Sequence, residues 1–162
     1  MEIAVFEDAA VENFGPLTLT RPAYKLYCGT TTLLEKINRH LALDGPAFLY
    51  ARDHLVPVIR EQHPDNPVNE PNPDKLLLVN GLLVVDEKTA AHIKGLDNNT
   101  AFVKDGRVAA AQLEKARAEQ IASLLKGGRL PLSLFERVEE AVQLRLLRYP
   151  WDLVYVSPSL IG

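Results

Sequence analysis

Short apolar runs alternate with helix-type patterns along most of this chain, and this alternation limits the folds that it can adopt. The runs at residues 3–6, 46–50 and 76–79 are mostly apolar, which is typical of strands that are covered on both faces. A helix pattern with one continuous apolar face begins at about Thr32, between the first two runs. The order predicts an α/β fold with a mainly parallel sheet and helices on both faces.

Residues typical of helix caps and tight turns predict where the other helices and strands begin and end. Thr32 and Glu35 form a capping box, in which each side chain accepts a hydrogen bond from the other residue's backbone N–H. Asp105-Gly106 lies between two β-compatible runs and predicts a tight antiparallel hairpin over residues 100–111, added at one side of the sheet. Three more elements are expected: a helix over residues 114–128, a helix from a second capping box of Ser133 and Glu136 to Pro150, and a last strand over residues 151–156.

The size and charge of the chain limit its function. Its 162 residues predict a single domain over residues 1–162. With 18 Lys and Arg against 21 Asp and Glu, a nucleic-acid surface is not expected, because phosphate backbones bind clustered cations. The N-terminal residues fit neither a signal peptide nor a membrane span. The single cysteine, Cys28, cannot pair within the chain, so we expect a reducing compartment, the cytoplasm.

A long connection separates the first strand from the next helix. Residues 7–31 lie there, whereas strand-to-helix loops usually have about 2–6 residues. In open α/β sheets, ligands bind beyond the carboxyl ends of the strands. We therefore expect the site at this edge. The residues expected to converge there lie in this connection or follow the third strand: Glu7, Asp8, Arg21, Asn80 and Gly81.

Several motifs carry a resemblance to a known family. "PLTLTRP" at 16–22, followed by "LLEKI", resembles the start of sugar-1-phosphate nucleotidyltransferases. "LTLTRPAYKLYCG", "YARDHLVP", "LLLVNG" and "RYPWDLV" resemble a divergent branch in which such a domain precedes a left-handed β-helix of acyltransferase type. The resemblance implies a Rossmann-like, nucleotidyltransferase-like fold and a place as the N-terminal part of a longer protein. It also allows a homo-oligomer formed through the β-helix domain.

The resemblance also implies ligands and residue roles. The expected ligands are an NTP and a sugar-1-phosphate, with Mg²⁺ as the cofactor if the domain is active. Arg21 and Lys25 are expected to be catalytic, and Asp152 is expected to bind the metal. Nucleotide contacts are expected from six residues: Glu7, Asp8, Arg52, Asp53, Asn80 and Gly81.

The chain departs from active members of this family at three places. Its first loop, "EDAAVENFG", has one glycine, although several would let backbone N–H groups approach a triphosphate closely. The lysine expected after the proline is replaced by Ala23, with Lys25 two positions later. The Gly-Asp pair that binds Mg²⁺ appears here as Asn80-Gly81, and a neutral amide is a poor magnesium ligand.

Two function classes therefore stay open. The first is transfer of a nucleotidyl group from an NTP to a sugar phosphate. The second is a catalytically degenerate domain that binds a nucleotide-sugar or packs against an attached acyltransferase. The four histidines show no paired metal-ligand spacing, which argues against a zinc site.

The candidate residues also have structural explanations. Arg21 can tie the long connection to a carboxylate of Glu7 or Asp8. Asn80-Gly81 can be a tight turn. Asp53 can cap a short helix that has Pro57 near its first turn, and Asp152 can be a capping or surface carboxylate.

Overall fold

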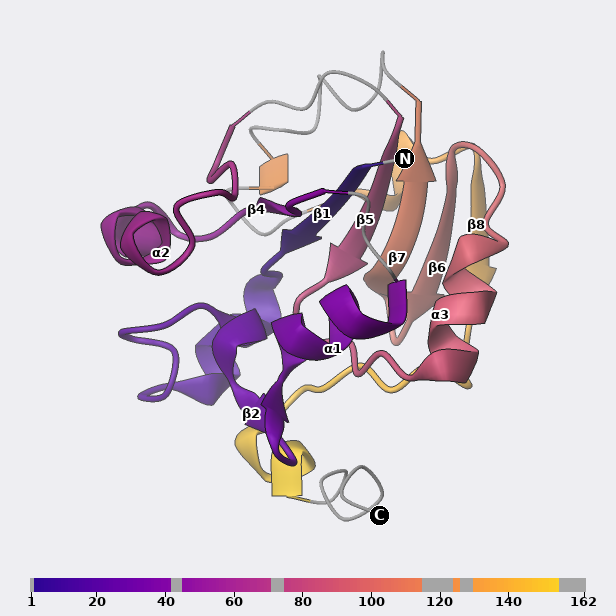
Figure 1. Cartoon of the computed structure of the whole chain (residues 1–162). Helices are drawn as coiled ribbons and strands as arrows, with labels where there is room; N and C mark the ends of the chain where they lie inside the picture. The colour runs from indigo at the N-terminus through magenta and orange to yellow at the C-terminus, as the bar shows by residue number, and fades with distance from the viewer. Residues whose placement is uncertain (1, 42–44, 71–74, 115–123, 126–129, 155–162) are drawn as a thin grey trace.

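The computed structural model describes residues 2–41, 45–70, 75–114, 124–125 and 130–154 of the chain, and six of its strands form one sheet (Figure 1). The strand order is β4-β1-β5-β7-β6-β8. The strands are β1 (Glu2–Phe6), β4 (Phe48–Leu49), β5 (Leu76–Asn80), β6 (Thr100–Lys104), β7 (Arg107–Leu113) and β8 (Arg137–Glu140).

The sheet is mainly parallel, as predicted. β1 pairs in parallel with β4 and β5, and β6 pairs in parallel with β8. Among the six described strands of this sheet, only β7 runs antiparallel to its neighbours, β5 and β6. Because β7 is antiparallel to β5, its first residues lie at the same edge as the carboxyl ends of β1 and β5. The predicted hairpin is confirmed, with Asp105 and Gly106 at φ of 52° and 75° in its turn, and it is part of the main sheet.

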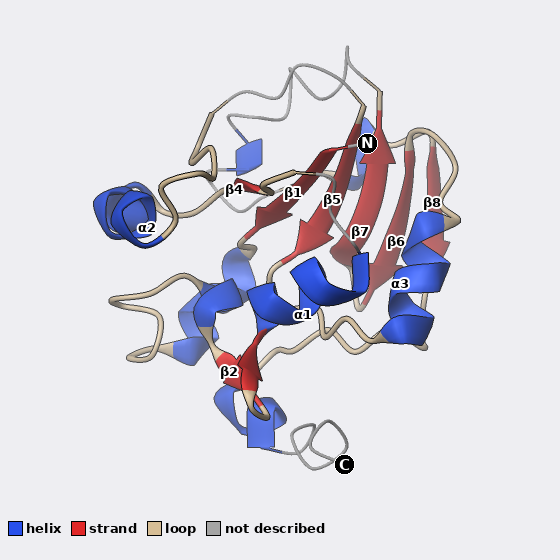
Figure 2. Cartoon of the chain, viewed as in Figure 1, coloured by secondary structure: helices blue, strands red, loops and turns tan. Residues whose placement is uncertain are grey.

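Helices α1 (Leu33–Leu41) and α3 (Glu87–Lys94) cover one face of the sheet (Figure 2). The apolar face of α1, which includes Ile37, packs on strand residues such as Val5 and Val79. The capping box is confirmed, because Thr32 N donates to Glu35 Oε2 at 2.7 Å and Glu35 N donates to Thr32 Oγ1 at 3.2 Å. Asp86 caps α3, which sequence patterns had not singled out.

The opposite face of the sheet is covered by side chains from residues 124–125 and 130–135. Leu125 and Phe135 pack with Phe6 and Leu78, and Leu134 of the 3₁₀ helix η4 (Leu132–Leu134) adds to this cluster. Burial of both faces explains why the central strands have so few polar side chains. These contacts, with α1 and α3 on the first face, agree with the predicted α/β, Rossmann-like arrangement.

The long connection has structure of its own. It contains the 3₁₀ helices η1 (Ala9–Phe14) and η2 (Ala23–Lys25) and a small hairpin of β2 (Tyr27–Cys28) and β3 (Thr31–Thr32). Phe14, Leu26 and Cys28 pack there against Leu33 and Leu82. Beyond β4, η3 (Asp53–Leu55) leads into α2 (Val56–Gln62), which has Pro57 in its first turn.

Two predictions for the last part of the chain were wrong. Residues 137–140 form edge strand β8, not a helix, because the backbone of β6 pairs with them along its free side. Residues 150–154 are helical, not a strand, and Asp152 accepts hydrogen bonds from the backbone N–H groups of Arg148 and Tyr149 at 2.9 Å. The helix predicted over 114–128 lies mostly outside the described residues, although Leu124 and Leu125 are helical.

Candidate functional site

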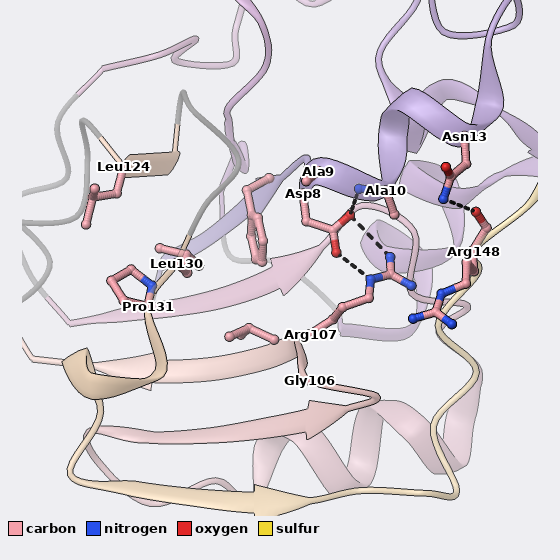
Figure 3. A pocket seen from close by; sticks show the side chains of 12 residues that line it. Asp8, Ala9, Ala10, Asn13, Gly106, Arg107, Leu124, Leu130, Pro131 and Arg148 are labelled. Atoms are coloured by element: carbon pink, nitrogen blue, oxygen red, sulfur yellow. Dashed lines mark hydrogen bonds and ion pairs between the residues drawn. The ribbon is translucent and has the colours of Figure 1, made fainter.

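A cleft of about 680 Å³ opens at the carboxyl end of β1, beside the start of β7 (Figure 3). One wall is aliphatic and comes from Leu124, Leu130 and Pro131. The polar side is built by Asp8, which follows β1, and by Arg107, which begins β7. The other lining residues are Phe6, Ala9, Ala10, Asn13, Gly106, Val108 and Arg148. The volume is typical of small-molecule sites, which measure about 300–1,000 Å³.

Asp8 organises the polar side of the cleft. Its Oδ1 accepts from Ala10 N at 3.1 Å and so caps η1. Arg107 holds both of its oxygens, with Nε to Oδ2 at 2.8 Å and Nη2 to Oδ1 at 3.2 Å. This is a bidentate ion pair between side chains that are only 13% and 15% exposed. The remaining guanidinium nitrogen of Arg107, Nη1, donates to Leu147 O at 3.0 Å.

Asn80 lies behind this pair and is completely buried. Its amide nitrogen donates to Asp8 Oδ2 and to Val108 O, each at 2.9 Å. Its oxygen accepts from Leu82 N at 2.9 Å. The Asn80 side chain therefore turns an N–H group, not an oxygen, toward the carboxylate of Asp8.

Glu7 lies in a second polar network. Its buried carboxylate accepts from Ala23 N at 2.8 Å and from Arg52 Nε and Nη2 at 3.2 Å each. Arg52 also donates to Thr18 O at 2.7 Å and to Arg21 O at 3.3 Å. The Glu7–Arg52 pair thus fastens the long connection to the sheet edge.

The two residues expected to be catalytic are not among the residues that line this cleft. The Arg21 residue is exposed, and its backbone oxygen is bound by Arg52. Lys25 Nζ lies 2.9 Å from His63 Nε2. Because the Lys25 ammonium group can only donate, the His63 ring accepts this hydrogen bond. Burial, and then the charge of Lys25, lower the pKa of His63.

The two remaining aspartates have structural contacts. Asp53 is exposed at the start of η3, and Asn69 Nδ2 donates to its Oδ1 at 3.5 Å. The expected Asp53 cap was wrong, because Arg52 is the N-cap residue and makes no side-chain capping bond. Asp152 caps backbone N–H groups, as one of its two interpretations expected. It lines a second cavity of about 410 Å³ beside the cleft.

Of the sequence candidates, the structure joins Asp8 to Asn80 and joins Glu7 to Arg52. Arg107 and Arg148, which line the cleft, were missed. The hairpin signal located Arg107 just after the turn, but the pairing of β7 with β5 was needed to bring it to Asp8. Arg148 stands in the motif "RYPWDLV", without any local sign of a ligand contact.

Tyr24 is fully buried beside Gly81, its hydroxyl has no hydrogen-bond partner among the described residues, and burial raises its pKa well above 10. Within the described ranges, no group of three or more His, Cys, Asp or Glu side chains is arranged to hold a metal ion. Among the helices that the structure describes, none is long and apolar enough to cross a membrane.

Comparisons with known proteins give matches to a family model and to solved structures. A family model described as sugar nucleotidyl transferase matches residues 3–161. Among solved structures, the chain is similar to a 2.76 Å crystal structure of a protein from Bacillus anthracis, assigned as a glucose-1-phosphate thymidylyltransferase and solved in complex with a sucrose. The TM-score is 0.53 at 9% identity, and the match covers 99% of this chain and 95% of that chain. At this identity the likeness shows the fold alone. No curated protein matches significantly.

Proposed function

Because this chain belongs to the family of sugar nucleotidyl transferases, we propose that its cleft binds a nucleotide-sugar without a metal ion, in a domain that has kept the family fold. The observation that carries this proposal is the Asp8–Arg107 ion pair. A guanidinium group of the chain itself neutralises the carboxylate that stands at the carboxyl end of β1.

The residues present do not fit Mg²⁺, which takes oxygen ligands. Both oxygens of Asp8 are bound by Arg107, and Asn80 presents its amide N–H on the same side. The oxygen of Asn80 is used by Leu82 N, and Asp152 Oδ2 is used by two backbone N–H groups. Freeing Asp8 for a metal would leave a partly buried guanidinium unpaired, which is costly.

A nucleotide-sugar in the cleft would contact the lining groups that Asp8, Arg107 and Asn80 do not already occupy. The aliphatic wall of Leu124, Leu130 and Pro131 offers an apolar surface for a base, and Asn13 and Arg148 are exposed polar groups at the opposite side. Small-molecule sites typically combine such apolar walls with a few polar groups that fix the ligand's orientation. An apolar wall on one side and polar groups on the other suit a ligand that has both a flat ring and a charged group.

Nucleotidyl transfer is the second candidate, and family membership favours it. In this reaction an oxygen of the sugar phosphate attacks the α-phosphorus of an NTP, and pyrophosphate leaves. If the chain is a transferase, we predict that it binds Mg²⁺, an NTP and a sugar-1-phosphate, and that Arg21 and Lys25 are catalytic. The cytoplasmic location, an attached β-helix domain and a homo-oligomer formed through that domain also stay predictions.

Calorimetric titration separates the two candidates. We expect dTDP-glucose or UDP-glucose to bind with the same affinity in Mg²⁺ and in EDTA, while pyrophosphate release from dTTP, UTP or GTP with glucose-1-phosphate stays at background. Arg21→Ala and Lys25→Ala should change the affinity by no more than about twofold, as expected for changes outside the cleft.

Two outcomes would contradict the proposal. Binding that requires Mg²⁺, together with pyrophosphate release that Arg21→Ala or Lys25→Ala lowers by about ten- to a hundredfold, would establish the transferase instead. No binding of any of these probes at millimolar concentration would show that the domain is not a nucleotide-sugar site.

A further inference from the structure

A second cavity adjoins the cleft, and Arg148 lines both. The second cavity measures about 410 Å³ and is lined by Lys104, Asp105, Arg145, Tyr149 and Asp152, together with Leu146 and Leu147. Both volumes fall in the range of about 300–1,000 Å³ that small-molecule sites occupy. Arg148 therefore stands where a ligand that enters one cavity can extend into the other.

The backbone of Arg148 is held in place, but its charge is not used. Its N–H donates to Asp152 Oδ2 at 2.9 Å, and its carbonyl oxygen accepts from Asn13 Nδ2 at 3.1 Å. The residue is exposed, and its guanidinium has no partner among the described residues. Figure 3 shows it on the same side of the cleft as Arg107, whose own guanidinium is bound to Asp8 and Leu147.

The charges around the two cavities favour an anion. Among the described residues, four basic and three acidic side chains line the two cavities together, whereas the whole chain has 18 basic and 21 acidic residues. Of the two arginines among the described residues that line the cleft, Arg107 is neutralised by Asp8. An arginine without a partner presents a planar fork of donors that matches phosphate oxygens.

We propose that Arg148 binds the diphosphate of a nucleoside diphosphate-sugar, whose base lies in the cleft and whose sugar lies in the second cavity. This inference rests on the proposed function. The cleft has the aliphatic wall that suits a base, and the second cavity has the carboxylates of Asp105 and Asp152, which can accept from sugar hydroxyls. The diphosphate, the charged middle of such a ligand, then meets the arginine that the two cavities share.

The test measures the affinities of four probes for the whole chain and for Arg148→Gln by calorimetry. The probes are dTDP-glucose, dTDP, glucose-1-phosphate and thymidine. We expect dTDP-glucose to bind more tightly than dTDP or glucose-1-phosphate. Arg148→Gln should weaken dTDP-glucose and dTDP by about ten- to a hundredfold and leave thymidine unchanged, because only a charge-assisted contact to phosphate is lost.

Two further variants sharpen the test. Arg60→Gln removes the same charge from an exposed position on α2, outside both cavities, and should change each affinity by less than about twofold. Asp152→Asn keeps an oxygen for the backbone N–H groups but removes the carboxylate. It should weaken dTDP-glucose and leave dTDP unchanged, because only the glucose arm enters the second cavity.

Each negative result rejects a different part of the proposal. If the wild type binds none of the phosphorylated probes, the proposed function is wrong as well. If dTDP-glucose binds but Arg148→Gln weakens it no more than Arg60→Gln does, the role of Arg148 is wrong while the proposed function stands. If Asp152→Asn weakens dTDP and dTDP-glucose equally, the second cavity does not hold the sugar. Circular dichroism checks that each variant is folded.

Discussion

At the scale of single residues, the side chains at the strand ends are largely engaged with one another. The side-chain amide of Asn80 forms hydrogen bonds with Asp8, Val108 and Leu82. Asn80 thus has a structural role, although it lies where the resemblance places the metal-binding Gly-Asp pair of active family members. Gly81 follows it with its N–H bound to Phe6 O at 2.7 Å. A Cβ atom on Gly81 would lie 2.9 Å from Tyr24 Cδ1 and 3.0 Å from Phe6 O. Close packing therefore explains this glycine without a ligand.

Gly81→Ala should lower the free energy of unfolding by about 1–3 kcal/mol, because the added methyl group meets backbone and a buried ring that have no room to move. Urea denaturation measures the change. Gly45→Ala is the matched control, since a Cβ atom added there would meet nothing within 4 Å, and it should shift stability by about 0.5 kcal/mol or less. Equal effects of the two substitutions would contradict this explanation.

At the scale of elements, side-chain caps and backbone pairing decide where helices and strands form. Asp86 caps α3 by accepting from Thr89 N at 2.7 Å. Residues 137–140, by contrast, carry helix-compatible residues, but they pair with β6 at the sheet edge. Hydrogen bonds to a neighbouring strand can outweigh a weak local preference for helix, since strand propensity depends strongly on context. Their charged side chains also suit an exposed edge.

The Asp86 cap should make stability depend on pH. Burial alone would raise the pKa of Asp86, but hydrogen bonds from Thr89 and the positive charges of Arg145 and His40 outweigh it and lower the pKa below 3.8. Folding therefore favours the ionised form, so its contribution is full well above pH 3.8 and is lost as the pH falls through and below that value.

The stability advantage of the wild type over Asp86→Asn should accordingly shrink between pH 7 and about pH 3, as measured by urea denaturation at each pH. Lys88→Gln, an exposed change in the same helix that leaves the carboxylate in place, should keep a constant offset from the wild type. An advantage of the wild type over Asp86→Asn that does not change with pH would show that the charge of Asp86 contributes nothing.

At the scale of the whole molecule, one sheet separates two apolar clusters. The cluster on the side of α1 and α3 includes Val5 and Val79, and the cluster on the other side includes Phe6 and Leu78. Successive residues of β1 and β5 thus contribute to opposite faces, as the alternation of side chains along a strand requires. The cleft lies at the carboxyl end of β1, and its lining residues Phe6, Leu124 and Leu130 belong to the second cluster or pack against it.

Leu78→Ala should lower the free energy of unfolding by about 2–5 kcal/mol, because the side chain is fully buried and a cavity would remain in the second cluster. Leu19→Ala makes the same chemical change where 64% of the residue is exposed, and it should cost about 0.5 kcal/mol or less. Thermal and urea unfolding measure both. A small loss in Leu78→Ala would mean that the second face of the sheet is not a packed core.

The sequence by itself determined the parts that depend on near neighbours. The buried strands β1 and β5, the capping box at α1 and the Asp105-Gly106 turn were readable because apolar runs, side-chain caps and turn residues act over a few positions. The same local patterns predicted a site at the carboxyl end of β1, where the structure has a cleft, since that edge of the sheet follows from strand direction. The motifs also identified the family correctly.

Tertiary structure alone decided which polar groups are engaged. Arg107 reaches Asp8 across 99 positions of sequence, and Arg52 reaches Glu7 across 45. Sequence patterns can show that a carboxylate or a guanidinium is present, but its freedom to bind a ligand depends on the distant partners that strand order brings within hydrogen-bond distance. The insertion of β7 beside β5 neutralised Asp8 with Arg107 and thereby left Arg148 as the exposed cation among the described residues that line the cleft.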